Sequence, residues 1–309
     1  MALTLAQAEL YTTNQVYRGV VEIFTRQSPI LGYLPFETIV GNAFQYVRES
    51  ASSSVAFRDP EETWTESTST VTQITTALKI LGGDADVDNF LKKTRSNYVD
   101  IMAELISEKV RETKKAFLDA FYYGDDAVNA KEFDGLHLLM NSSNDINQGS
   151  SATGAALSMA NLDTLIDTIL DGPPDILVMP KQIRRRINAY VRINGGTYQE
   201  SRDDWGNTIQ MYNGIPMYVD EGLVLTETIA SSTYSAKTGG ATGSIFAIKF
   251  GMPGGVFGIQ NGTVEVKPLG DLETKDAVRT RVRWYCGLGL GNYEGLTRVD
   301  GITDAAAVS

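Results

Sequence analysis

The sequence contains one cysteine and one histidine in 309 residues, and these two scarcities exclude several kinds of site. With Cys286 alone, no intrachain disulfide, paired-cysteine redox site or cysteine-rich zinc site can form. A Ser-His-Asp triad would have to use His137, and no G-x-S-x-G motif accompanies it. No apolar run reaches about 18 residues, so no membrane-spanning helix and no membrane partner are expected. Residues 1–12 lack both basic residues and a long apolar stretch, so they do not form a secretory signal.

Positive charge is also scarce, with 27 Lys and Arg against 38 Asp and Glu and a net charge of −11. A protein that holds nucleic acid tightly through its phosphates needs a basic surface, so this balance argues against such a function. Apolar residues make up 42% of the chain, which is ordinary for a globular protein. The length permits one large domain or two modest ones, each with its own core.

The sequence of the first quarter of the chain predicts extended segments that have no hydrophobic core of their own. Residues 1–38 show apolar residues at helical spacing, interrupted at Ser28-Pro29 because the residue before proline leaves the α region. Residues 39–78 alternate as strands do and contain a turn-like acidic stretch at 59–62. A lone hairpin is only marginally stable in water, so we expect this one to lie on something else.

Two long elements are predicted from their periodicity. Residues 95–123 predict a helix of roughly 40–45 Å that ends at Gly124 and could form a structural spine. Residues 276–292 predict a long strand with period two. Its apolar face would contain Val278, Thr280, Val282, Trp284, Cys286, Leu288 and Leu290, with Arg279, Arg281, Arg283 and Tyr285 on the opposite face.

Residues 137–265 predict a mixed α/β region. Helices are expected around residues 162–169 and 181–191, and strands at 176–179, 214–219, 245–250 and 255–259. Residues 230–243 are rich in Ser, Thr, Gly and Ala and predict an exposed loop.

No candidate catalytic constellation emerges from these patterns. Gly287, Gly289 and Gly291 lack the spacing of a dinucleotide-binding loop and continue the alternation of a strand. His137 has apolar neighbours, which favours a satisfied or exposed histidine over a general base. Cys286 is expected to be a buried structural cysteine. We therefore predict no catalytic residues, no cofactor-binding residues and no cofactor.

Three clusters of charged residues are candidate binding sites. The cluster at Arg184, Arg185 and Arg186 could bind phosphate, but adjacent helical residues point to different sides, which favours a solvated or subunit-contacting face. Carboxylates also gather at 59–66 and 84–88 without the Gly and Glu positions of a calcium loop, so acidic surface loops are expected. No metal ligands are assigned, and metal binding between subunits is left open. The carboxylates concerned are Asp59, Glu61, Glu62, Glu66, Asp84, Asp86 and Asp88.

Several stretches, in this order along the chain, resemble the major capsid proteins of tailed double-stranded DNA bacteriophages, a fold shared with encapsulins. These are Gln27 to Phe36, Phe133 to Leu136, Asp175 to Arg186, Gly214 to Pro216 and Arg283 to Leu288. Each stretch is weakly specific by itself, and their order carries the resemblance across most of the chain.

The resemblance implies an α+β tailed-phage capsid fold. It implies an N-terminal arm (1–38), a long hairpin called the E-loop (39–78) and a peripheral domain with a spine helix (79–136). An axial domain (137–265), a strand returning to the peripheral domain (266–303) and a frayed tail (304–309) would follow.

The resemblance also implies a function, that of a non-enzymatic major capsid protein. It would self-assemble as pentamers and hexamers into an icosahedral head that encloses double-stranded DNA without sequence-specific binding. Its partners would be other copies of itself, a separate scaffolding protein, a portal and a decoration protein. The location would be the virion capsid, assembled in the host cytoplasm. No long helical leader precedes the arm, which is why a separate scaffold is expected.

Some members of the family join subunits through an isopeptide bond from an E-loop lysine to an asparagine. Here residues 1–78 contain no lysine, and the first is Lys79. We therefore expect no covalent cross-link from the hairpin.

Other functions are compatible with parts of this pattern. An encapsulin nanocompartment shell has the same fold and would hold a cargo enzyme in place of DNA. A phage tail protein or surface adhesin would form trimers or fibres, and an enzyme would need converging titratable groups that the sequence does not single out.

Overall fold

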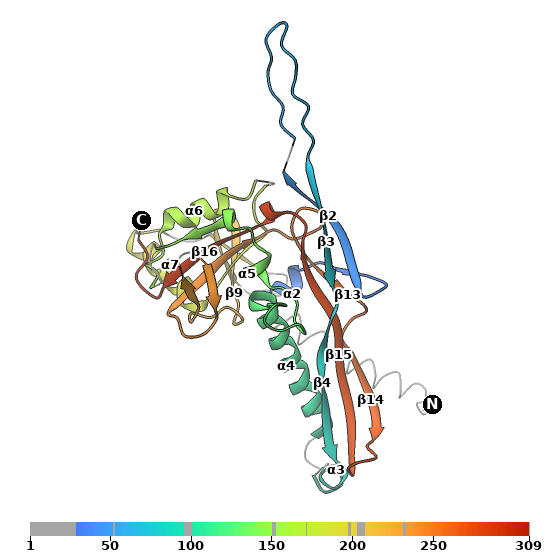
Figure 1. The fold of residues 1–309 in the computed structure, drawn as a ribbon. Coiled ribbons are helices and arrows are strands. Elements are labelled where there is room, and N and C mark those ends of the chain that lie inside the picture. The colour runs from blue at the N-terminus through green and yellow to red at the C-terminus, as the bar shows by residue number, and fades with distance from the viewer. Residues whose placement is uncertain are drawn as a thin grey trace, which may run out of the picture.

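The computed structural model describes residues 29–51, 53–95, 101–149, 153–170, 172–196, 199–202, 208–230 and 233–308. The helices expected within residues 1–28 lie outside this part of the chain. The structure is α+β, as predicted, and contains two large sheets, a small two-stranded one and a long hairpin that projects from one of the large sheets (Figure 1). None of the helices in the described part is long and apolar enough to cross a membrane.

The first described element is a short helix, α2 (Pro29–Tyr33), followed by strand β1 (Phe36–Thr38). The helix begins at Pro29, where the missing N–H costs nothing because no intrahelical bond would use it. The helix that Ser28-Pro29 was predicted to interrupt lies outside the described residues, so that interruption stays a prediction. Ile30 is fully buried, so this segment is anchored in the main core.

A five-stranded sheet carries the long strand predicted near the C-terminus. Its order is β1-β13-β15-β14, and β4 also pairs with β15. The alternation of β15 is confirmed, since Val282, Trp284 and Cys286 are buried while Arg281 on the other face is exposed. The strands are β4 (Lys79–Asp88), β13 (Val256–Gln260), β14 (Glu265–Asp271) and β15 (Ala277–Leu290).

The spine helix packs against this sheet. It is described as α4 (Ile101–Tyr123), preceded by the short helix α3 (Asn89–Arg95), and residues 96–100 of the predicted helix lie outside the described part. Val110, Phe117 and Phe121 are fully buried, as the helical spacing predicted. The helix ends before Gly124, where a Cβ atom would lie 2.1 Å from the Phe133 carbonyl oxygen. Close backbone approach therefore requires glycine at this end.

The second sheet has seven strands in the order β5-β16-β12-β6-β9-β8-β7 and is mixed. β6 pairs parallel with β9 and antiparallel with β12, and β16 pairs antiparallel with β12. The strands are β5 (Asp145–Asn147), β6 (Ile176–Met179), β7 (Gln199–Arg202), β8 (Thr208–Tyr212), β9 (Ile215–Val219), β12 (Thr242–Ile248) and β16 (Leu296–Thr303).

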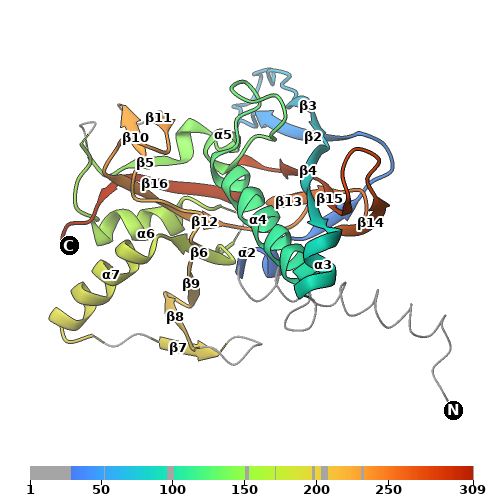
Figure 2. The ribbon, with the colours of Figure 1, turned by 90° about the horizontal axis from the view of Figure 1, so that it is seen from below.

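Each face of this sheet contributes to a different core. Leu177 and Met179 of β6 pack with the helices α6 (Met159–Asp167) and α7 (Lys181–Ile193), which lie together on one side of the sheet (Figure 2). Ile176 and Val178 face the other way and join the core around the end of α4. The strand is buried on both faces, which explains its continuous apolar sequence.

One expectation about the second half is wrong. The segment 230–243 is not one exposed loop, because it contains β11 (Thr233–Ala236), paired with β10 (Thr228–Ala230), and the buried start of β12. The strand predicted at 255–259 is confirmed as β13, which lies in the five-stranded sheet. Residues 296–303 form β16 of the seven-stranded sheet.

The C-terminal tail is also not frayed up to residue 308. Val308 forms a parallel bridge with Ser158, and its N–H donates to the Leu157 carbonyl at 2.8 Å. Asp304 binds Arg185 and Arg186 on α7. The small residues of the tail predicted fraying. Backbone pairing at Val308 and the ion pairs of Asp304 order the tail against the rest of the chain.

Candidate functional site

The most exposed feature of the described chain is a hairpin formed by β2 (Ala43–Ala51) and β3 (Thr70–Ala77), within the predicted segment 39–78 (Figure 1). The base of this hairpin lies on the five-stranded sheet. Phe44 and Tyr46 contact the buried Phe257 ring edge-on, at centroid distances of 6.1 and 5.3 Å. Arg48 lies over the Tyr293 ring, 3.9 Å from its centroid. Only the base is therefore held by the chain's own core.

The tip of the hairpin, residues 53–69, lies beyond that support, and every residue in it is exposed. It turns at Asp59–Glu62, where the Glu62 N–H donates to the Asp59 carbonyl at 3.2 Å, so the predicted turn is confirmed. Val55 and Phe57 are 94% and 107% exposed. A single copy of the chain leaves these apolar side chains in water, which is typical of surfaces that another protein covers.

The outer face of the five-stranded sheet carries a ladder of ion pairs. Asp84 and Asp86 were expected in an acidic loop, but they lie on β4 and face two arginines of β15. Arg281 Nε donates to Asp84 at 2.7 Å, and Arg279 Nε donates to Asp86 at 2.7 Å. These hydrogen bonds lower the pKa of both carboxyl groups. The acidic and basic stretches are therefore partners across strands, and neither is a separate binding site.

His137, the one histidine, is buried at the start of α5 (Leu136–Leu139), where α4 meets the seven-stranded sheet. Its Nδ1 lies 2.7 Å from the Tyr122 carbonyl and its Nε2 lies 3.5 Å from Glu227 Oε1. Glu227 is fully buried and also accepts hydrogen bonds from Tyr123 at 2.8 Å and Ser244 at 2.5 Å. His137 is therefore buried, with one hydrogen-bonded nitrogen and one nitrogen without a hydrogen-bond partner among the described residues, and it does not line either of the two grooves described below.

A second buried charged group lies beside this one. The Arg298 side chain donates to both carboxylate oxygens of Asp145, at 2.9 and 2.5 Å, and lies 3.5 Å from Asp300. Burial opposes the charge of Arg298, but Asp145 and Asp300 outweigh it, and the pKa is raised. Burial, assisted by Asp145, raises the pKa of Asp300 to about 7 against the opposing effect of Arg298. This group links β5 to β16 and is a structural ionic cluster.

Sequence reasoning did not identify Glu227, Arg298 or Asp300. The one available signal was the alternation of Arg298 and Asp300 within an apolar stretch, which places two charged side chains on one face of a strand. That strand itself had not been predicted.

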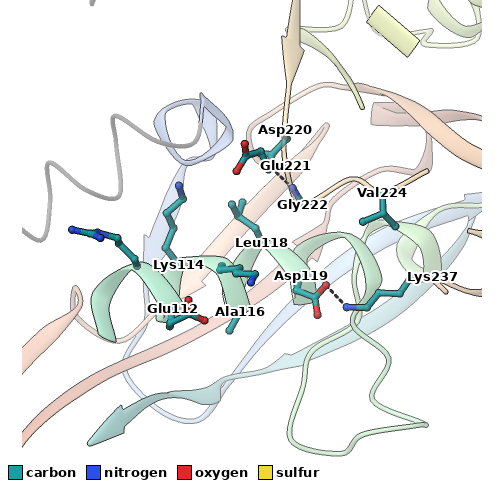
Figure 3. A pocket seen from close by; sticks show the side chains of 12 residues that line it. Glu112, Lys114, Ala116, Leu118, Asp119, Asp220, Glu221, Gly222, Val224 and Lys237 are labelled. Atoms are coloured by element: carbon teal, nitrogen blue, oxygen red, sulfur yellow. Dashed lines mark hydrogen bonds and ion pairs between the residues drawn. The ribbon is translucent and has the colours of Figure 1, made fainter. Parts of the chain in front are cut away.

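An open groove of about 550 Å³ lies between α4 and the loop after β9 (Figure 3). Its lining is mixed in sign: Lys114 lies near Asp220 and Glu221, and Lys237 forms an ion pair with Asp119. Burial lowers the pKa of Lys114, opposed by the two nearby carboxylates. Because the charges largely neutralise one another, the groove has no clear preference for an anion or a cation.

The glycine-rich stretch of β15 is structural, as predicted. A Cβ atom on Gly289 would lie 2.6 Å from the Phe257 ring, and one on Gly287 would lie 2.9 Å from Ile259. Both glycines therefore allow close packing of β15 on β13. Cys286 on the same strand is buried, and burial raises the pKa of its thiol to about 12, so it is not a nucleophile.

Among the described residues, no group of three or more His, Cys, Asp or Glu side chains could hold a metal ion. The structure brings together an ion-pair ladder, a buried ionic cluster and a projecting hairpin. None of these is arranged around a pocket in which a substrate could react.

The profile of the Phage capsid family matches residues 11–301 of the sequence. The chain belongs to the phage capsid family. It is therefore a structural shell protein, as the resemblance implied. No curated protein sequence matches it significantly.

Solved structures agree on the fold. The SrpI encapsulin complex of Synechococcus elongatus is 13% identical, with a TM-score of 0.69, covering 91% of this chain and 89% of that one. The capsid of a native GTA particle is 14% identical, with a TM-score of 0.60 and coverages of 89% and 90%. A chain from Mycobacterium phage Adephagia is 12% identical, with a TM-score of 0.61 and coverages of 90% and 91%. At these identities the likeness concerns the fold alone.

Proposed function

We propose that this shell protein assembles with other copies of itself, as pentamers and hexamers, into an icosahedral phage head that encloses double-stranded DNA. The observation that carries the proposal is the hairpin, whose tip has no support from its own chain and exposes Val55 and Phe57. If each copy covers the tip of the next copy, the contacts are heterologous. A series of such contacts closes into a ring. Burying these side chains on a neighbour offsets the entropy lost when the tip becomes ordered.

In this proposal residues 39–78 are the E-loop, α4 is the spine helix of a peripheral domain, and the seven-stranded sheet forms an axial domain. Residues 1–38 would be the arm. The chain would have no catalytic activity, cofactor or membrane partner. A separate scaffolding protein, a portal and a decoration protein would complete the head in the host cytoplasm, and the mature location would be the virion.

The test is assembly of the full chain, with and without the exposed apolar tip. The variant Val55→Ser with Phe57→Ser should leave the urea unfolding midpoint of the subunit unchanged, because neither side chain contacts a core cluster. It should lower the yield of closed particles in negative-stain electron microscopy at least tenfold. The matched control is Val128→Ser, which removes another exposed apolar side chain, 84% exposed, far from the hairpin along the chain. Particles of normal yield from the tip variant would contradict the proposal.

The second candidate, an encapsulin shell, is favoured by the TM-score of 0.69 to an encapsulin, compared with 0.60 and 0.61 for the two capsid structures above. The match to the phage capsid family favours the phage head. The contents of purified particles separate the two, since a phage head holds DNA and an encapsulin holds a cargo enzyme.

A further inference from the structure

Helix α7 carries a strip of positive charge that the ion pairs of the described chain explain only in part. Four basic side chains and one asparagine on this helix line a shallow groove of about 390 Å³. The opposite face, with Ile183 and Ile187, is buried against the sheet. The groove is lined by Lys181, Arg184, Arg185, Asn188 and Arg192.

Helix stability does not account for this strip. The helix dipole disfavours cations near a helix N-terminus, yet Lys181 and Arg184 lie in the first four positions of α7. Asp304 pairs with Arg185 and Arg186, which explains two of the basic residues. Within the described part of the chain, no carboxylate is paired with Lys181, Arg184 or Arg192.

The net charge of −11 does not cancel the local positive potential of this strip. At physiological ionic strength the screening length is about 8 Å, so distant carboxylates contribute little at the groove. From Lys181 to Arg192 the helix rises about 16 Å, and duplex DNA carries one charge per about 1.7 Å of its axis. One groove can therefore face several phosphates at once.

We infer that the α7 groove is a weak, sequence-independent binding site for the phosphate backbone of the enclosed nucleic acid. Lys181, Arg184 and Arg192 make the phosphate contacts, while Arg185 is shared with Asp304. The inference rests on the proposed function, because it places α7 on the inner wall of a shell that contains DNA. Few contacts per copy give weak binding, so DNA can move during packaging while many copies together hold it.

The test measures binding of a fluorescent 20-base-pair duplex to the full-length, unassembled chain by anisotropy between 50 and 200 mM salt. With three phosphate contacts, the affinity should fall about 40-fold over this range. The variant Arg184→Ala with Arg192→Ala keeps good helix formers and should retain only about a fourfold dependence. The control Arg111→Ala with Lys115→Ala removes the same charge from exposed positions of α4 and should behave as the wild type.

Three outcomes would overturn the inference. These are absence of salt-dependent duplex binding, equal losses in the two variants, or tighter binding of poly-glutamate than of the duplex, which would indicate an acidic protein partner. Particle formation is scored separately by electron microscopy. Wild-type particles without duplex binding would refute the α7 site alone, whereas failure of the wild type to form particles would refute the shell.

Discussion

At the scale of single residues, Asp300 has an unusual position, because its carboxyl group is fully buried beside a second carboxyl group. Asp145 already satisfies Arg298 with two hydrogen bonds, and the nearest Arg298 nitrogen is 3.5 Å from Asp300. The buried Glu227 adds negative charge, and it is contacted by His137 and by the Tyr123 hydroxyl, which donates to it. One arginine thus faces three carboxylates.

This arrangement predicts a pH dependence of stability. The pKa of Asp300 rises from an ordinary 3.8 to about 7 on folding, so the folded state binds a proton that the unfolded state has lost. The stabilisation is complete below pH 4 and disappears as the pH rises through 7. The variant Asp300→Asn removes this dependence. At pH 8 it should be more stable than the wild type by about 1–2 kcal/mol, less than the full shift implies because neighbouring groups relax.

Urea unfolding of the unassembled chain from about pH 2 to 8, followed by tryptophan fluorescence, measures this difference. The control Asp304→Asn should show the opposite trend, because Arg186 and Arg185 lower the pKa of Asp304. Its contribution is present at neutral pH and is lost as the pH falls below 3.8. A pH-independent difference between Asp300→Asn and the wild type would show that Asp300 is already ionised in the folded chain.

Gly258 is a second residue with a specific requirement. It lies on β13 opposite Phe36 of β1, and a Cβ atom there would lie 2.5 Å from the Phe36 ring. That ring packs against Trp284 and Phe117, so it has little room to move. Gly258→Ala should destabilise the chain by about 1–3 kcal/mol through overpacking, seen as a lower urea midpoint. Gly32→Ala, in α2 with nothing within 4 Å, is the neutral control.

At the scale of elements, the hairpin divides into a supported base and an unsupported tip. Because no core cluster includes a residue of 53–69, the tip should contribute to assembly and not to subunit stability. Replacing residues 52–69 with Asn-Gly joins Ala51 to Thr70, which are paired in the hairpin, through a favoured two-residue turn. The thermal midpoint of the subunit should stay within about 2 °C while sedimenting particles disappear. A large loss of subunit stability would show that the tip folds onto its own body.

The elements that could be predicted are those that bury one face against a single neighbouring element, because their apolar residues then recur with a regular period. α4 lies on one sheet and β15 has one buried face, so their periods of 3.6 and 2 are visible in the sequence. β16 is buried along almost its whole length, and β10 and β11 are three and four residues long. Apart from Arg298 and Asp300, β16 does not alternate between apolar and polar residues, and β10 and β11 are too short to show a period, so these elements could not be predicted.

The candidate site was predictable to a similar extent. The turn at 59–62 and the exposed hairpin follow from local composition, which is why they were found. The pairing of Asp84 with Arg281 depends on a strand register linking residues 197 positions apart. The burial of Glu227 and Asp300 depends on how α4, α5 and β16 meet. Such information is tertiary, and no window of the sequence contains it.

At the scale of the whole molecule, the assembled shell should be held by non-covalent contacts. An isopeptide bond requires a lysine amine next to an amide or carboxyl group of another copy. The hairpin supplies no such amine, since residues 1–78 contain no lysine. Lys79, at the base, is engaged within its own chain, where its Nζ donates to Asp126 at 2.9 Å and to the Ala130 carbonyl at 2.8 Å.

Mature particles boiled in detergent should therefore run as one band at the monomer mass of 33.7 kDa. Particles treated beforehand with glutaraldehyde should give a ladder, which shows that the gel resolves joined subunits. A ladder from untreated particles would mean that a lysine outside the hairpin reaches a neighbouring copy, and mass spectrometry of the joined peptides would identify it. A single band means that the stability of the shell comes from burial and ion pairs between copies, which denaturant should reverse without any covalent cleavage.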